Sequence, residues 1–327
     1  MKAVCLPALA GLVLFAVHAR GVTFTEDFAT DPLTNGWEEF GETNLFQWNS
    51  TNEDLDVTWD SSERNSYFYH ALGTTLTRAD DFRVEFDIRL KDIQWTNTFE
   101  LAVGLFNLAY ATNAGFSRPL GYTPDLFEYD YFPDSGDAQS DPNVEATMTD
   151  DVPGITDFPD FYFVYDDLPM ETGTVYHVEL DHAAGEAGLT GEVFTNSVFT
   201  NSPPYTTMPI VYAGPISDFR LDTLSVMSYS DAGDTQGDSI LAHGTVDHFA
   251  VRLPPLVRNL TGLSSNGVWQ AAFDTYTNEA YTLERSTNLV FWSAAAGPVN
   301  GTGGRMTLDD EAPAADHAFY RVRADQQ

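Results

Sequence analysis

Apolar and polar residues alternate along much of this chain. Residues 81–91 show the pattern clearly, because every second position is apolar and the positions between are mostly charged. The same two-residue period predicts strands at 99–105, 160–165, 174–180, 189–199, 218–228 and 245–253, separated by Gly, Pro, Asn and Asp. No stretch has the period of a long helix. We therefore predict an all-β fold, an antiparallel β-sandwich that spans 22–253.

A proline pair follows the last of these strands. Neither Pro254 nor Pro255 fits inside a central strand, so residues 253–255 are predicted to be a linker. Shorter apolar runs follow at 267–273, 280–286, 290–292, 305–308 and 318–323, with a glycine-rich turn at 301–304. These runs predict a small C-terminal β-domain over 254–327, with Trp269 and Trp292 in its core.

The N-terminus has the three parts of a secretory signal. Lys2 precedes an apolar run at 9–16, and Val17 and Ala19 place small residues where a signal peptidase requires them. We predict a signal peptide over 1–19, with a secreted or cell-surface mature chain. The run is too short for a permanent membrane anchor, so no membrane insertion is expected. Cys5, the single cysteine, lies in this segment, and the mature chain would contain no disulfide.

The charge of the chain limits its partners. Asp and Glu number 49 against 15 Lys and Arg, a formal net charge of −34. The acids are spread along the sequence, which indicates a solvated globular surface that repels nucleic acid and anionic membranes. With 43% hydrophobic residues the chain can still bury a core. There is no Gly-x-Ser-x-Gly elbow, P-loop or dinucleotide fingerprint.

Residues 126–134 are the best candidate for a chemical site. On a strand, Glu128 and Asp130 point to one face, and Phe127, Tyr129 and Tyr131 to the other. Two acids on one face repel each other, so one should bind its proton more tightly. We predict that the two acids line a groove and bind a sugar. Structural hydrogen bonding and cation binding are the alternatives.

Tryptophans supply candidate stacking platforms for that groove. Trp37, Trp48, Trp59 and Trp95 lie in the predicted sandwich, and an exposed aromatic ring stacks well on a sugar face. Trp95 is predicted to join Glu128 and Asp130 in ligand binding. For each ring singly, packing in the core is the alternative interpretation.

Two acidic loops suggest calcium as a cofactor. Asp231, Asp234 and Asp238 are closely spaced with glycine between them, and calcium prefers carboxylate and carbonyl oxygen ligands. We predict that calcium, if it binds, uses these three residues. A second such loop starts at Asp134 and Asp137 and continues to Asp141, Asp150 and Asp151. Neither fits the EF-hand pattern, and a solvated acidic turn is the alternative for both.

The order of several segments resembles the concanavalin A-like (laminin G-like) jelly roll. The segments are Asp27-Phe28, Gly36-Trp37 and residues 82–90, 103–107 and 244–251. Residues 281–289, with Trp292 and 318–322, are similar to a small C-terminal β-module that recurs in exported proteins of Verrucomicrobia and related bacteria. These resemblances imply a jelly-roll sandwich and an exported bacterial protein.

Residues 128–134 also resemble the catalytic strand of laminarinase-like glycoside hydrolases. The resemblance implies Glu128 as nucleophile and Asp130 as its assisting carboxylate. It departs at the acid/base, because Phe132 and Pro133 stand where a glutamate is expected and Asp134 is the next acid. Retaining hydrolysis needs carboxyl groups roughly 5–5.5 Å apart, which only a sharp bend at Pro133 would allow.

Three functions follow from these patterns. The first is a secreted carbohydrate-recognition protein that binds an extracellular polysaccharide. The second is a laminarinase-like glycoside hydrolase, in which Glu128, Asp130 and Asp134 would be catalytic. The third is a surface structural or adhesive protein.

Overall fold

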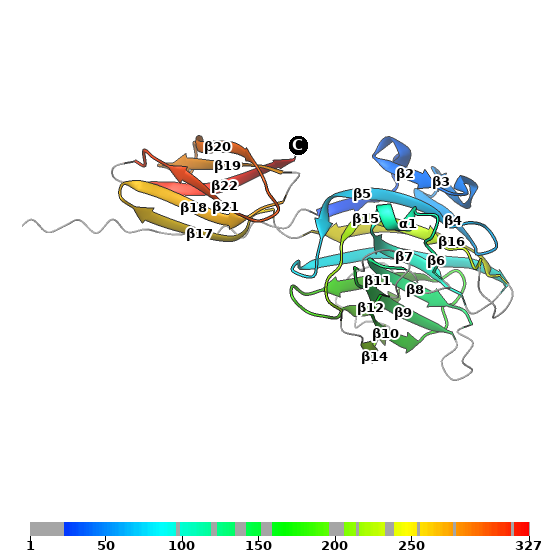
Figure 1. Cartoon of the computed structure of the whole chain (residues 1–327). Coiled ribbons are helices and arrows are strands. Elements are labelled where there is room, and N and C mark those ends of the chain that lie inside the picture. Colours follow the sequence, from blue (N-terminus) through cyan, green and yellow to red (C-terminus); the bar gives the residue numbers. More distant parts are fainter. Residues whose placement is uncertain are drawn as a thin grey trace, which may run out of the picture. The chain divides into compact units, whose positions relative to one another are not determined.

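The computed structural model describes residues 23–95, 99–118, 123–134, 142–151, 159–195, 206–213, 216–232, 239–253, 256–276, 279–314 and 317–326. The chain divides into two compact units, one of Thr23–Pro254 and the other containing Pro255–Gln327 (Figure 1). Among the described residues, no helix is long and apolar enough to cross a membrane.

Two eight-stranded antiparallel sheets make up the larger unit (Figure 1). Sheet I runs in the order β13 (Thr206–Thr207), β12 (Thr190–Thr195), β11 (Val175–His182), β6 (Phe82–Trp95), β16 (Leu241–Arg252), β4 (Asp54–Asp60), β3 (Phe46–Asn49), and β1 (Thr23–Glu26) pairs with β16. Sheet II runs in the order β14 (Ile210–Ala213), β10 (Phe161–Asp167), β9 (Asn143–Thr149), β8 (Leu126–Phe132), β7 (Leu101–Phe106), β15 (Leu221–Ser228), β5 (Ser66–Leu76), β2 (Trp37–Phe40). The predicted antiparallel jelly-roll sandwich is confirmed.

The core lies between the two sheets. The alternating apolar positions at the start of β6 are buried, as the pattern predicts; they are Phe82, Val84, Phe86, Ile88 and Leu90. Phe82 on sheet I meets Phe127 on sheet II with ring centroids 4.8 Å apart, and Phe86 meets Tyr129 at 5.7 Å. The side chains between these positions on each strand therefore point away from the core, to the outer face of their sheet.

Helical structure in the described part of this unit is short. It consists of α1 (Leu108–Ala111) and two 3₁₀ turns, η1 (Pro32–Thr34) and η2 (Thr43–Leu45). Asn107 caps α1 by accepting hydrogen bonds from the backbone N–H groups of Ala109 and Tyr110. The Tyr67 hydroxyl, on the outer face of sheet II, donates to the Ala111 carbonyl at 3.1 Å. The segment that contains α1 thus covers part of that outer face.

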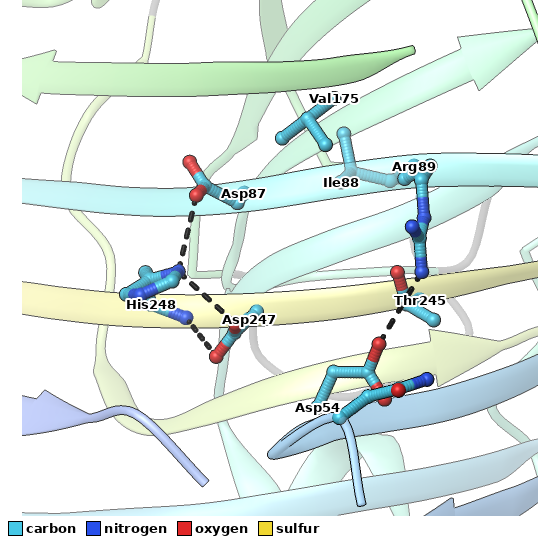
Figure 2. Close-up of a pocket in the computed structure, with 9 residues that line it drawn as sticks. Asp54, Asp87, Ile88, Arg89, Val175, Thr245, Asp247 and His248 are labelled. Atoms are coloured by element: carbon cyan, nitrogen blue, oxygen red, sulfur yellow. Dashed lines mark hydrogen bonds and ion pairs between the residues drawn. The ribbon is translucent and has the colours of Figure 1, made fainter. Parts of the chain in front are cut away.

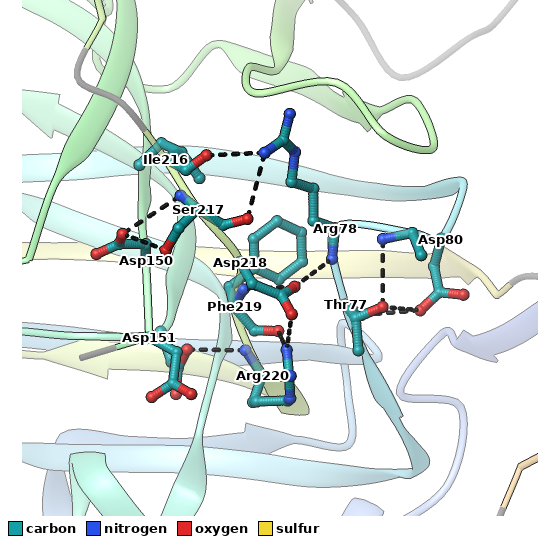
Figure 3. Close-up of polar contacts among 12 residues, drawn as sticks. Thr77, Arg78, Asp80, Asp150, Asp151, Ile216, Ser217, Asp218, Phe219 and Arg220 are labelled. Atoms are coloured by element: carbon teal, nitrogen blue, oxygen red, sulfur yellow. Dashed lines mark hydrogen bonds and ion pairs between the residues drawn. The ribbon is translucent and has the colours of Figure 1, made fainter. Parts of the chain in front are cut away.

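Arg78 joins three connecting segments near the end of β5. Figure 3 shows its guanidinium donating to the carbonyls of Ile216 and Ser217, at 3.1 and 3.2 Å. The same group donates to the carbonyls of Gly185 and Glu186. One side chain therefore satisfies four backbone acceptors in connections far apart in the sequence.

The smaller unit contains two three-stranded antiparallel sheets. One is β17 (Arg258–Ser265), β18 (Val268–Asp274), β21 (Arg305–Asp310), and the other is β20 (Ser293–Asn300), β19 (Glu279–Ser286), β22 (Phe319–Gln326). Its core holds Trp269, Ala271, Phe273, Tyr281, Leu283 and Leu308.

Two expectations for this unit are wrong. Residues 290–292 form a bend before β20 instead of a strand, because the side chains of Ser286 and Asn288 bind the backbone N–H groups that a strand would use. Trp292 lies outside the core, where the Arg321 guanidinium covers its ring at 4.3 Å. Trp269 is in the core as predicted and stacks on Tyr320 at 3.8 Å.

Candidate functional site

Glu128 and Asp130 point to the outer face of sheet II. Phe127, Tyr129 and Tyr131 are buried on the opposite face, so the predicted alternation of β8 is confirmed. Gly104 of β7 lies directly opposite Glu128. A Cβ at that glycine would stand 2.3 Å from the Phe127 carbonyl oxygen, so only glycine lets the two strands approach this closely beside the acid.

Both carboxylates are covered by Arg118, from the segment after α1. Its Nη2 lies 2.9 Å from Glu128 Oε1 and 3.4 Å from Asp130 Oδ2. Its Nε forms a third ion pair with Glu100 Oε1 at 3.2 Å. The two β8 acids are 0% exposed, Glu100 is 4% exposed, and the Arg118 side chain retains 18%. One buried cation therefore serves three buried carboxyl groups, so full ionisation would leave an excess of negative charge.

The cluster relieves this excess by retaining protons. Burial raises the pKa of Glu100 to about 7, and burial, with the nearby Glu128 charge, raises the pKa of Asp130 well above its usual range. Thr147 gives independent evidence, since its Oγ1 lies 2.9 Å from Asp130 Oδ2 and 2.8 Å from Glu145 Oε1. A hydroxyl has one proton to donate, and a proton held on Asp130 would let that carboxyl donate to the threonine oxygen, in agreement with its raised pKa.

The expected open groove at Glu128 and Asp130 is not present in this conformation. Neither carboxylate has exposed surface with which to touch a sugar or to protonate a glycosidic oxygen. Asp134 lies two residues beyond the end of β8 and is half-buried. Trp95 ends β6, and its side chain is outside the described residues. Trp37 and Trp59 are buried in the core, and Trp48 packs against it.

An aromatic strip, which we define as Phe161, Phe163 and Tyr165, lies on the same outer face, two strands from β8. The register places Phe163 opposite Thr147, which is opposite Glu128. The ring centroids of Phe161 and Phe163 are 5.9 Å apart, as are those of Phe163 and Tyr165. Phe161 is 41% exposed, and the other two rings are half-buried.

Polar groups border the aromatic strip on the side of the acidic cluster. Glu145 pairs directly with Tyr165 across β9 and β10, and its side chain is half-buried. Burial raises the pKa of Glu145. Arg118, with its remaining exposed surface, lies on the Glu128 side. The face therefore combines rings with an accessible acid and a fixed cation, which is the composition of a small-ligand site.

The predicted calcium loop is described only in part. Asp231 Oδ2 accepts a hydrogen bond from the Ser61 hydroxyl at 2.8 Å, and the Asp231 N–H donates to the Ser61 carbonyl. Asp234 and Asp238 lie outside the described residues, so this site remains a prediction. Within the part of the chain that the structure describes, no three His, Cys, Asp or Glu residues are grouped to hold a metal ion.

In the comparisons with known proteins, this chain matches solved structures but neither family models nor curated proteins. Lectin II from Ulex europaeus is 13% identical with a TM-score of 0.44, and the match covers 72% of this chain and 99% of the lectin. The Emp47p carbohydrate recognition domain is 8% identical with a TM-score of 0.40, covering 69% and 94%. A Bacillus subtilis protein of unknown function with a galectin-like fold is 11% identical with a TM-score of 0.38, covering 72% and 98%. Such distant similarities carry no argument about the ligand of this chain.

Proposed function

We propose that this chain is an exported carbohydrate-recognition protein that binds a neutral polysaccharide on the outer face of sheet II. The observation that carries the proposal is the partly exposed aromatic strip beside Glu145. Aromatic faces pack on the apolar C–H face of a sugar ring, and a carboxylate accepts strong hydrogen bonds from its hydroxyl groups. In this proposal Glu128 and Asp130 support the site from below, by holding Arg118 and Glu145 in place.

The net charge of −34 narrows the class of glycan. Sulfated or uronic acid polymers would approach a surface of the same sign, which slows their association and weakens their binding. A neutral polymer carries no such penalty. The predicted signal segment over 1–19 supports binding outside the cell as part of the proposal. Calcium at Asp231, Asp234 and Asp238 is also part of it, as a cofactor of the loop.

A binding experiment with matched variants tests the proposal. The exported chain would be titrated by calorimetry with soluble neutral polysaccharides, among them a β-glucan, a mannan and a galactan. For a polymer that binds, Phe163→Ala should weaken binding by about 1–2 kcal/mol, or roughly five- to thirtyfold in Kd, because one ring loses its contact with the sugar. Phe291→Ala is the matched control, since that ring is 78% exposed but belongs to the smaller unit.

The acid gives a second test on the same titration. Glu145→Gln keeps the size of the side chain and should weaken binding by about 1 kcal/mol, because a charge-assisted hydrogen bond becomes a neutral one. Equal affinities for Phe163→Ala, Glu145→Gln and the unchanged chain would refute binding at the aromatic strip. Release of reducing sugar that disappears in Glu128→Gln would replace the proposal with the hydrolase interpretation.

A further inference from the structure

The outer face of sheet I, on the opposite side of the sandwich from the aromatic strip, contains a hollow of about 330 Å³. Strands β4, β6 and β16 supply most of its lining, and Figure 2 shows the polar side chains that meet there. The polar residues of the lining are Asn52, Asp54, Asp87, Arg89, Thr245, Asp247 and His248. Its volume is in the range of pockets that hold small molecules.

A bulge in β16 gives one wall of the hollow its shape. The register with β6 shifts between Asp247 and Ala250, and His248 has a φ of 51°. The hollow is consequently lined by two consecutive residues, Asp247 and His248. His248 Nδ1 lies 3.1 Å from Asp87 Oδ2 and 3.0 Å from Asp247 Oδ2, and the other Asp87 oxygen lies 2.7 Å from His177 Nδ1. Both oxygens of Asp87 are therefore engaged.

The other wall leaves hydrogen-bonding capacity unused. Asp54 is 6% exposed, and its Oδ2 meets Arg89 Nη2 at 3.4 Å. Asp54 Oδ1 and Arg89 Nε are both buried and have no hydrogen-bond partner within the described part of the chain. An unpaired buried acceptor and an unpaired buried donor on facing residues are costly, and a ligand that paired with both would recover that cost.

The charges of the hollow select the ligand. A carboxylate or phosphate would face Asp54, Asp87 and Asp247, so these three carboxyl groups disfavour an anionic ligand. A hydroxyl avoids this conflict, because it can donate to Asp54 while accepting from Arg89. Two neighbouring hydroxyl groups on a sugar ring can each donate one hydrogen bond and accept another.

We propose that this hollow is a second binding site, which takes one neutral monosaccharide unit through its hydroxyl groups. Both unpaired atoms are shielded from water here, and a sugar reaches them by displacing the Arg89 side chain. That side chain is 34% exposed, and within the described residues its one ion pair is the long contact with Asp54. The site does not depend on the aromatic strip. If both sites bind, a single chain holds two glycans on opposite faces and cross-links them.

The test uses two sugars that share one ring and differ in charge. Glucose and glucuronate would each be added to the full chain while the imidazole C–H signals of its seven histidines are followed by NMR. Variants His177→Gln and His248→Gln assign the two signals at the hollow. We expect glucose to shift the His248 signal in a saturable way, with glucuronate binding at least tenfold more weakly.

Variants locate the effect. Asp54→Ala and Arg89→Ala should each raise the glucose Kd, measured from the His248 signal, at least tenfold. If one of the two variants fails to fold, the other is enough for the test. Arg64→Ala is the control, since it removes an exposed cation that does not line this hollow and should leave the Kd unchanged. Glucuronate binding as tightly as glucose, or glucose shifts that persist in both hollow variants, would overturn the proposal.

The two proposed binding sites can be refuted independently of each other. Phe163→Ala should leave the His248 shifts intact, whether or not it weakens polysaccharide binding at the aromatic strip. If the His248 shifts were lost in Phe163→Ala, the hollow would not be a separate site. If the shifts persisted and polysaccharide binding were also unchanged in Phe163→Ala, only the proposal for the aromatic strip would be refuted.

Discussion

Replacing Arg118 with methionine removes the single cation of a cluster that contains Glu100, Glu128 and Asp130. Methionine keeps much of the length of arginine, so the change acts mainly on charge. None of the three carboxyl groups is more than 4% exposed, so water cannot replace the guanidinium. Breaking a buried ion pair from one side typically costs about 3–5 kcal/mol.

Proton uptake sets the size of this loss. A carboxyl group without its cation can take a proton, and for an ordinary glutamate pKa of 4.5 this costs about 3–4 kcal/mol at pH 7. At pH 4.5 the same proton uptake costs almost nothing. The free energy of unfolding of Arg118→Met should therefore fall by about 3–4 kcal/mol at pH 7, and by about 1 kcal/mol or less at pH 4.5.

Urea denaturation at the two pH values measures this difference, with the m-value checking that the same surface unfolds. Arg64→Met is the matched control, because Arg64 lies 2.9 Å from Glu42 but its side chain is 67% exposed. That pair should contribute less than about 1 kcal/mol at either pH. If Arg118→Met were no more destabilising than Arg64→Met at pH 7, or equally destabilising at both pH values, Arg118 would not compensate the buried acids.

Four further outcomes are expected. The pKa of Glu100 is about 7 in the folded chain, above the ordinary 4.5, so its contribution to stability is complete below pH 4.5 and is lost as pH rises through 7. Glu100→Gln should therefore raise the free energy of unfolding at pH 8 by about 3 kcal/mol, as measured in urea titrations. Arg78→Ala should cost about 2–3 kcal/mol of unfolding free energy, since four carbonyls lose a donor, and lysine should restore less than half. Millimolar calcium should raise the melting temperature, and Asp234→Ala should abolish that rise. N-terminal sequencing of the exported chain should begin at Arg20, and a start within residues 1–19 would contradict the predicted signal peptide.

The fold could be predicted from the sequence where one face of a strand is apolar and the other polar. Strand β6 satisfies this condition, since Phe82, Phe86 and their apolar neighbours alternate with charges. The strand at 143–149 was missed because both its faces are largely buried, so no polar alternation marks it. Strand β17 was missed for the opposite reason, since its positions are exposed or half-buried throughout and carry little apolar signal.

Only those features of the candidate site that depend on the local sequence pattern could be predicted. The period of β8 places Glu128 and Asp130 on one face, but their exposure depends on Arg118, which comes from a connecting segment without a recognisable motif. The aromatic strip is visible as Phe161 and Phe163 at alternate positions. Because the residues between them are also apolar, the sequence does not decide which face of that strand is open.

Through Glu145, a rise in pH has opposite effects on the stability of the sandwich and on binding at the aromatic strip. Burial raises its pKa, so the folded chain holds this proton more tightly than the unfolded chain, and rising pH weakens the fold at this residue. The ionised form accepts stronger hydrogen bonds from sugar hydroxyls, so the same rise in pH favours binding at the aromatic strip. Thr147 and Arg118 partly offset the cost of ionisation, because the hydroxyl and the guanidinium both lower the pKa of Glu145. Thr147 and Arg118 thus keep Glu145 closer to its ionised, sugar-binding form, while the Glu128 charge raises the pKa of Glu145 and acts in the opposite direction.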